Sequence, residues 1–177
     1  MDWFNEQISL NSLIWLFFAA FMIHDFEEII VVEKWMKRNH GLVRSALPKP
    51  LRRRFDSLQH ITSAQFAVAV ALEFIMFIPV TWMAAEHHSF LLFIGFNAVL
   101  FIHVFTHLFQ SIYLRMYTPG VVTAVFVTLP YSVYLFYRLA ELNMLTWWSF
   151  IQSLAVGLIL IPIVMLGHII GKKIIPD

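Results

Sequence analysis

Two short stretches of the sequence carry residues whose types and spacing suit metal binding. His24 and Glu28 are four residues apart, and His103 and His107 repeat that spacing later in the chain. Residues three or four apart lie on the same face of a helix, and two histidines at this spacing are typical of helical zinc sites. The stretches therefore predict one metal site. Its expected ligands are His24, Glu28, His103 and His107.

The chain has no cysteine. This excludes disulfides, thiolate metal sites, iron–sulfur clusters and cysteine nucleophiles. A metal must then bind through imidazole, carboxylate or amide groups, which favours zinc, iron or manganese over softer metals. We expect a divalent metal, with zinc first and iron as the alternative.

Three glutamates are the expected catalytic acids and bases: Glu27, Glu28 and Glu73. A general base must lie within hydrogen-bonding reach of the proton it removes. Glu27 and Glu28 share a helical face with His24, because three or four residues separate them. Glu73 lies near the middle of another apolar segment, and its long side chain is expected to reach the site.

Three further polar residues are expected to support the site. Asp25 points to another face of its helix and is assigned an orienting or proton-accepting role. Asn97 shares a helix with the histidine pair but is rotated by about 80–120° from it, given 3.6 residues per turn. His168 lies at the end of its apolar segment, where a histidine usually bridges helices or meets the interface.

The segments that carry these residues are predicted to cross a membrane. Hydrophobic residues make up 60% of the 177-residue chain, against the 45–50% typical of soluble domains. They gather into five runs near the length of about 20 residues that a spanning helix needs. We expect a single all-α membrane domain over residues 1–177. Its predicted spans are Leu13–Val32, Thr62–Ala84, Phe90–Phe109, Pro119–Tyr137 and Trp147–Ile170.

Ionisable groups inside a membrane helix cost at least about 2.5 kcal/mol each at the bilayer centre when charged. The two candidate clusters also lie at one level. Counted along the helices from their outer ends, His24 lies about 17 Å deep, Glu28 about 23 Å, and His103 and His107 about 20 and 26 Å. Groups of this kind at one depth are best explained by a shared ligand.

Basic residues predict the orientation. In the five-span arrangement 11 of the 12 Lys and Arg residues fall on one side, and only Arg138 falls on the other. The positive-inside rule then places the N-terminus outside and the C-terminus in the cytoplasm, and we expect a bacterial cytoplasmic membrane. The loop Glu33–His60 contains the cluster Arg52–Arg54, interpreted as an anchor near anionic headgroups. No nucleic-acid partner is expected.

The motif His24-x-x-Glu27-Glu28 resembles that of the HXXEE-domain family of small multi-span membrane proteins, whose function is unknown. Asn97, the later histidine pair and the turn Tyr117–Gly120 carry the same resemblance, which covers about residues 12–170. It implies that His24, Glu27 and Glu28 are the family's motif residues.

The leading functional hypothesis is a metal-dependent intramembrane hydrolase acting on a lipid or another apolar substrate near the cytoplasmic leaflet. In its zinc version His24, His103 and His107 hold the metal and Glu28 or Glu27 is the general base. This three-histidine arrangement resembles that of intramembrane ceramidase-type hydrolases, although the spans and order differ. A di-iron lipid oxidase or desaturase would use the same three histidines with Glu27, Glu28 and Glu73. A proton or divalent-ion transporter would require a homodimer. Haem held by two histidines would leave the glutamates unexplained.

Overall fold

Helices make up nearly all of the chain. A computed structural model describes residues 2–176, without the side chains of residues 2–4 and 54, and these residues form no strand. The predicted all-α class is confirmed. In the arginine cluster Arg52–Arg54, the structure describes the side chains of Arg52 and Arg53. The elements are α1 (Asp2–Gln7), α2 (Leu10–Ala46), α3 (Lys49–Asp56), α4 (Ser63–His87), α5 (Leu91–Leu114), α6 (Val121–Thr123), the π-helix η1 (Ala124–Thr128), α7 (Leu129–Glu141), α8 (Trp147–Gly157) and α9 (Leu160–Ile174).

Hydroxyl side chains begin three of the long helices. The hydroxyls of Ser9, Thr62 and Thr146 each accept a hydrogen bond from the backbone N–H three residues further on, which satisfies a donor that the first helical turn leaves free. Pro48 follows Leu47, the residue that caps the C-terminal end of α2. The loop predicted at residues 33–60 is mostly helical, because α2 runs on to Ala46 and α3 follows it.

The described residues contain four helices, not five, that are long and apolar enough to cross a membrane: Ser63–His87, Leu91–Leu114, Val121–Glu141 and Trp147–Ile174. The predicted span at Leu13–Val32 is not among them. It belongs to α2, the longest helix with 37 residues. Asp25, Glu27 and Glu28 interrupt its apolar run, so composition alone does not mark it as a span.

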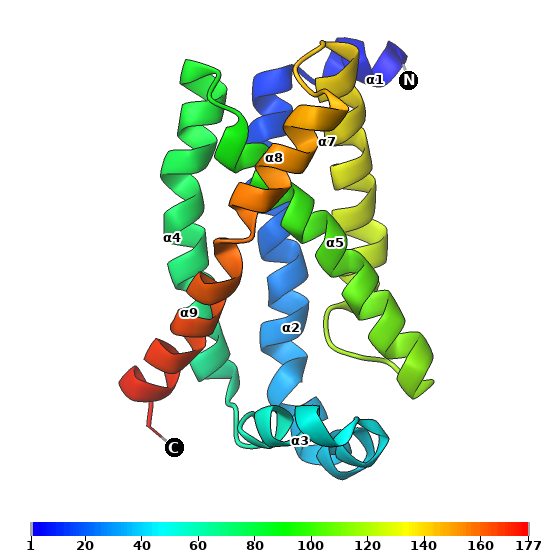
Figure 1. Ribbon diagram of the computed structural model, residues 1–177, viewed down its shortest axis with the longest axis vertical. Coiled ribbons are helices and arrows are strands. Elements are labelled where there is room, and N and C mark those ends of the chain that lie inside the picture. Colours follow the sequence, from blue (N-terminus) through cyan, green and yellow to red (C-terminus); the bar gives the residue numbers. More distant parts are fainter. Residues whose placement is uncertain (1, 177) are drawn as a thin grey trace.

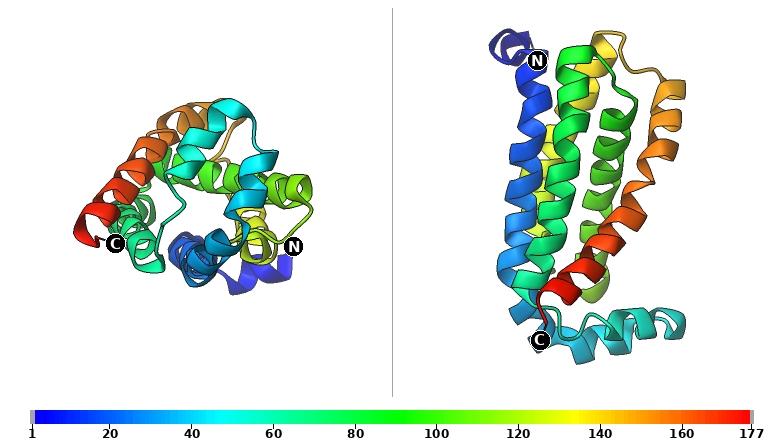
Figure 2. Two further views of the ribbon diagram at one scale, coloured as in Figure 1. Left: turned by 90° about the horizontal axis from the view of Figure 1, so that it is seen from below. Right: turned by 90° about the vertical axis from the view of Figure 1, so that its left-hand side faces the viewer.

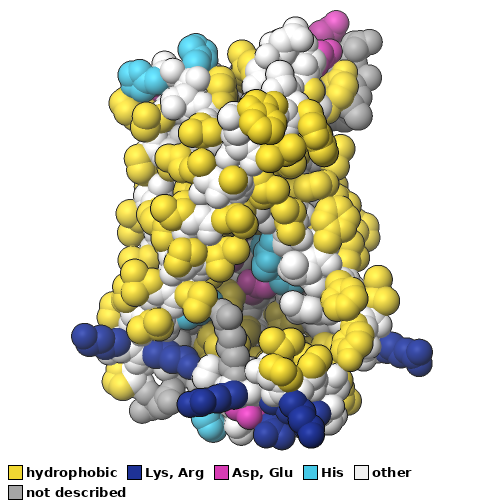
Figure 3. All heavy atoms as spheres, in the orientation of Figure 1, with side chains coloured by type: hydrophobic (Ala, Val, Ile, Leu, Met, Phe, Trp, Pro, Cys, Tyr) yellow, Lys and Arg dark blue, Asp and Glu magenta, His cyan; other side chains and the backbone are white. Residues whose placement is uncertain are grey.

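The helices stand side by side as a bundle, with α1 at one end and α3 and the C-terminus at the other (Figure 1). An aromatic core holds the upper half together. Phe17 contacts Phe77 and Phe93 with ring centroids 5.0 and 5.7 Å apart, and Phe21 lies 4.8 Å from Phe77. Large apolar side chains also cover the outside of the bundle (Figure 3), as expected of a surface that faces lipid.

The last span is broken rather than continuous. α8 ends at Gly157 and α9 begins at Leu160. Pro162 lacks the N–H that would bond to the carbonyl of Leu158, so the helical ladder is interrupted there. α8 packs against α5, and α9 packs against α4, so α9 diverges from α5 below the break (Figures 1 and 2).

Glycines allow both contacts. A Cβ at Gly157 would lie 2.3 Å from the carbonyl oxygen of Gly95 on α5, and one at Gly167 would lie 3.2 Å from the Cβ of Ala69 on α4. Close backbone approach at small residues is typical of helix packing in membranes. The contacts therefore fix α8 and α9 against different partners.

Candidate metal centre

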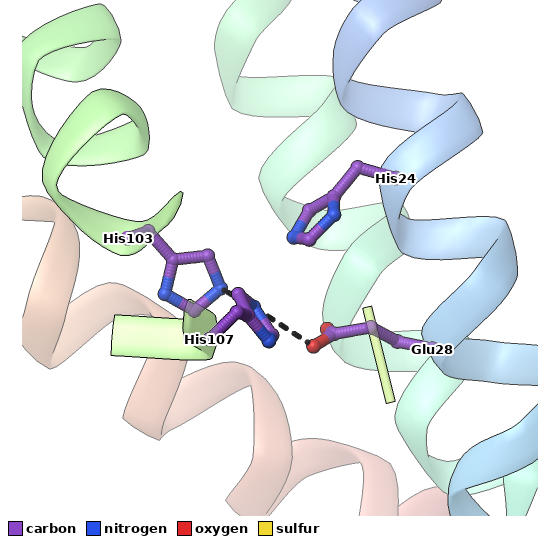
Figure 4. A group of neighbouring side chains, drawn as sticks. All are labelled: His24, Glu28, His103 and His107. Atoms are coloured by element: carbon purple, nitrogen blue, oxygen red, sulfur yellow. Dashed lines mark hydrogen bonds and ion pairs between the residues drawn. The ribbon is translucent and has the colours of Figure 1, made fainter. Parts of the chain in front are cut away.

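Four side chains from two helices meet in the interior of the bundle. His24 and Glu28 come from α2, and His103 and His107 come from α5. One candidate ligand atom from each residue lies within 4.8 Å of all the others. His24 and His107 are 1% and 4% exposed. The structure thus brings together the four ligands that the sequence predicts (Figure 4).

The three imidazoles face a common centre. The Nε2 atoms of His103 and His107 are 2.8 Å apart, and Nε2 of His107 lies 3.3 Å from Oε1 of Glu28. The ring of His24 approaches from the other side, with its centroid 4.9 Å from that of His107 and 5.5 Å from that of His103. Zinc binds imidazole nitrogen and carboxylate oxygen in such four-ligand groups.

Glu27 belongs to a neighbouring network and not to this group. Its Oε1 accepts a hydrogen bond of 2.6 Å from the hydroxyl of Tyr117. Its Oε2 accepts bonds from the backbone N–H and the hydroxyl of Thr123, at 2.7 and 2.6 Å. Thr123 lies in the first turn of the span Val121–Glu141, so Glu27 caps this helix end, where a carboxylate is favourable.

Thr123 links Glu27 to His24 and assigns the histidine tautomer. Its hydroxyl proton is donated to Glu27, because a carboxylate that accepts three hydrogen bonds acts only as an acceptor. The same hydroxyl oxygen lies 3.1 Å from Nδ1 of His24 and must therefore accept a hydrogen bond from the Nδ1–H group. The lone pair of His24 is then on Nε2, which is buried and has no hydrogen-bond partner.

The same reasoning applies to His103. The hydroxyl of Thr106 donates to the backbone carbonyl of His103 at 2.7 Å and lies 3.2 Å from its Nδ1. The hydroxyl oxygen of Thr106 therefore accepts a hydrogen bond from the Nδ1–H group of His103. The lone pair of this imidazole is then on Nε2, which faces His107. Outer hydrogen bonds of this kind orient histidine ligands and fix their tautomers in metal sites.

A turn covers the site from outside. Gly120 has φ +83°, and a Cβ there would lie 2.7 Å from Cε1 of His107 and 2.8 Å from Oε1 of Glu28. The turn is attached to α2, because Trp35 donates to the carbonyl of Tyr117 at 2.7 Å. Partial burial and the hydrogen bond to Glu27 raise the pKa of Tyr117, so its phenol remains a donor.

The cluster lies in the wall of a cavity of about 1000 Å³. This is at the upper end of the roughly 300–1,000 Å³ of small-molecule sites. The lining is mostly apolar, and the hollow is visible in the lower half of the molecule with His and acidic side chains inside it (Figure 3). The candidate ligands are therefore accessible to a molecule that enters the bundle.

The remaining predicted site residues lie in different places. Asp25 and Glu73 line the cavity, as Glu28 does, and are 7% and 8% exposed. His168 also lines the cavity and contacts Phe66. Asn97 is fully buried, does not line the cavity and donates to the carbonyl of Phe93 within its own helix, so it supports α5 rather than the site.

Sequence reasoning missed Thr123, and it used Tyr117 and Gly120 only as features of a resemblance. Thr123 follows Gly120 by three residues at the start of a predicted span, a position where exposed helical N–H groups need acceptors. That signal marks a helix end. It does not reveal that the acceptor comes from a distant helix.

Replacing Thr123 with valine is expected to weaken metal binding without unfolding the protein. The change removes the hydroxyl that fixes His24 and keeps the backbone N–H bond to Glu27. Loss of an outer hydrogen bond to a metal ligand typically costs about 10–100-fold in affinity, which competition with a fluorescent zinc chelator measures. Thr128→Val, a buried change in the same span, is the control. Equal affinities in both variants would contradict the proposed link.

Replacing Gly120 with alanine is expected to destabilise the protein and distort the site. A left-handed backbone costs a residue with a Cβ about 1–2 kcal/mol, and the new methyl group would press on His107 and Glu28. Thermal unfolding in detergent measures the loss. Gly41→Ala is the control, because a Cβ there meets nothing within 4 Å and alanine favours a helix. A Gly120 variant as stable as wild type would refute the close contact.

Together these features define a helical bundle of membrane type with a buried group of three histidines and a glutamate. The chain belongs to the family described as "Protein of unknown function with HXXEE motif", whose model matches residues 15–135. It is 26% identical over 166 residues to "Uncharacterized protein YrkK" of Bacillus subtilis (strain 168), a match that covers 90% of this chain and 96% of that protein. No solved structure matches.

Proposed function

We propose that this protein is a metal-dependent intramembrane hydrolase, with zinc as its metal and a lipid or other apolar molecule as its substrate. The observation that carries the proposal is the group of His24, Glu28, His103 and His107 in the wall of a large apolar cavity. Zinc held by three histidines keeps a fourth position for water and turns that water into a nucleophile near neutral pH.

In this proposal the three imidazoles bind through Nε2 and Glu28 acts as the general base. Its Oε1 lies 3.3 Å from Nε2 of His107, next to the position that a reacting water would take. Glu28 accepts the proton of the water as the water oxygen attacks the substrate carbonyl. The bond from the carbonyl carbon to the leaving nitrogen or oxygen then breaks, and the proton passes from Glu28 to the leaving amine or alcohol. Asp25 and Glu73 lie on the wall of the same cavity and are the further carboxylates that could accept it.

A di-iron oxidase is the second candidate, because Asp25, Glu28 and Glu73 line one cavity. Among the described residues, the lining of this cavity includes no Lys or Arg. Carboxylates from facing helices are the usual ligands of such sites. Against it, the hydrogen bonds of Glu27 turn that carboxylate toward Thr123 and Tyr117. The two candidates differ in metal identity and number.

We also propose that α2 crosses the membrane as a fifth span, with the N-terminus outside a bacterial cytoplasmic membrane. Asn5, just before α2, bonds to Glu141 at the end of α7. At the other end of α2, the carbonyl of Ala46 accepts a bond from Tyr113 near the end of α5. α2 therefore extends over the same distance as the candidate spans. The polar residues that interrupt its apolar run include His24 and Glu28, two of the candidate ligands.

Single introduced cysteines are expected to report this orientation, because the chain has none of its own. Ser45 and Ser89 are exposed at opposite ends of the bundle. A membrane-impermeant maleimide applied to intact cells should label Ser89→Cys and leave Ser45→Cys unlabelled until the cells are broken. Labelling of Ser45→Cys in intact cells would reverse the proposed topology.

The decisive experiment is elemental analysis of the detergent-purified protein, prepared without chelators, followed by assays of lipid amides, esters and phosphoesters. About one zinc per chain, as three histidines predict, together with hydrolysis of one of these classes supports the proposal. Iron near two per chain supports the oxidase instead. If the purified protein contains no metal, both the hydrolase and the oxidase proposals are overturned. That result favours a proton or ion pathway, which flux measurements in liposomes would test.

A further inference from the structure

We propose that the cavity takes up an acyl lipid with an anionic headgroup, which enters sideways between α5 and α9 from the leaflet at the basic end of the bundle. This inference rests on the proposed function and names the substrate class of the same site. Four features support it: a side opening, an apolar interior, the depth of the histidine cluster and the charge around the opening.

The side opening follows from the broken last span. α9 packs against α4 and diverges from α5 below Gly157, so both helices contribute to the cavity wall. Residues 161, 164, 165 and 168 of α9 and residues 109, 110, 113 and 114 of α5 line it. The hollow opens on this face, among exposed apolar side chains (Figure 3). A molecule dissolved in the bilayer can reach it without passing through water.

The interior suits a hydrocarbon chain. Above the histidines, toward the α1 end, the lining consists of aromatic and aliphatic side chains of α2, α4 and α5 that include Phe17, Phe21, Phe77, Phe96 and Leu100. Among the residues that the structure describes, Glu73 is the buried polar residue on the wall of this part. An acyl chain placed here would extend from the histidines toward the middle of the bilayer.

The depth of the cluster matches the acyl linkage rather than the end of the chain. Glu28 precedes Lys34 by six residues, and His107 precedes Arg115 by eight, which is about 9 and 12 Å along a helix. The polar region of a leaflet is about 5–8 Å thick. A lipid whose headgroup lies among the basic residues would therefore bring its ester or amide carbonyl close to the ligands.

Charge at the opening selects an anionic headgroup. α3 forms the floor of the cavity with Leu51 and Phe55, and Lys and Arg side chains gather around this end of the molecule (Figure 3). Glu33 and Asp56, acidic residues of the same end, already pair with Lys37 and Arg44. The remaining basic side chains of this end include Lys49, Arg53 and Lys173.

Photo-crosslinking tests the inference. The full chain is reconstituted in vesicles that contain phosphatidylglycerol or phosphatidylcholine with the same diazirine at the end of one acyl chain, and the modified residues are mapped by mass spectrometry. We expect adducts on the interior segments around Phe17, Phe77 and Phe96, with about fivefold higher yield for phosphatidylglycerol. That ratio equals about 1 kcal/mol, the contribution of one Lys or Arg near an anionic surface.

Two matched variants separate entry from general contact with the bilayer. Ile161→Trp/Val164→Trp narrows the opening and is expected to reduce the interior adducts at least about fivefold. Leu166→Trp/Ile169→Trp has the same spacing on the same helix, at exposed positions that do not line the cavity, and should leave them unchanged. Adducts confined to the outer surface would overturn the inference. Equal yields from both lipids would overturn its headgroup selection.

A third variant distinguishes failure of this inference from failure of the proposed function. His103→Ala/His107→Ala removes two metal ligands and leaves the apolar interior intact. Interior adducts that persist in a protein without metal would support the lipid site even if no hydrolysis is found. A wild-type protein that binds metal and hydrolyses a lipid but gives no interior adduct would retain the function and exclude this route.

Discussion

Replacing His103 and His107 together with alanine is expected to abolish metal binding. Both Nε2 atoms point into the candidate site, 2.8 Å apart, and the change leaves His24 and Glu28 as the remaining candidate ligands of the group. Structural zinc sites bind with apparent free energies of about 10–16 kcal/mol shared among their ligands. Zinc content, measured by mass spectrometry, should therefore fall from about one per chain to less than about a tenth.

The matched control is His60→Ala/His87→Ala, which also removes two histidines, at exposed positions. It should keep the wild-type zinc content. Gel filtration of both variants shows whether they remain folded, and the single variants His103→Ala and His107→Ala provide intermediate cases. Equal zinc in the two double variants would mean that the metal binds elsewhere, and the proposed centre would then have to be abandoned.

Replacing Glu28 with glutamine is expected to stop hydrolysis while the zinc remains bound. The amide keeps the size of the side chain but cannot accept a proton from water near neutral pH. Removing a general base costs about 10²–10⁴-fold in rate. Initial rates on the best substrate of the lipid panel measure the loss, and zinc content is determined on the same sample.

Glu33→Gln is the control, because Glu33 lies five residues beyond Glu28 on α2 and does not line the cavity. Its carboxylate bonds to Lys37 and to the backbone N–H of Ser63. It should retain the wild-type rate. If Glu28→Gln instead loses its zinc along with its activity, Glu28 is a ligand and the base must be sought at Asp25 or Glu73. A fully active Glu28 variant would argue against hydrolysis at this site.

Spacing alone determined which residues belong together on each helix. A separation of four residues places His24 with Glu28 and His103 with His107, whatever the rest of the fold does, because an α-helix has a fixed pitch. Apolar run lengths likewise predict four of the spans to within a few residues. Hydropathy does not identify the fifth predicted span, Leu13–Val32, because Asp25, Glu27 and Glu28 interrupt its apolar run.

The tertiary structure decided what faces what. Periodicity assigns Glu27 to the face of His24, yet its carboxylate turns to the start of the candidate span Val121–Glu141, because that helix end offers the backbone N–H and hydroxyl of Thr123. It assigns Asp25 to another face, yet the cavity extends far enough around α2 to include it. Neither outcome follows from one helix, since Glu27 depends on Thr123, 96 residues further on, and Asp25 depends on the other helices that line the cavity.

The sequence did not predict the break between α8 and α9 in the last span. Its composition reads as one continuous apolar helix, and Pro162 and Gly157 are both tolerated within spans. Only the packing of Gly157 against Gly95 and of Gly167 against Ala69 shows that the two halves have different partners. Residue types and spacing thus determined the candidate ligands, whereas the contacts between helices created the cavity that makes them accessible, because a cavity is a property of surfaces that no single helix contains.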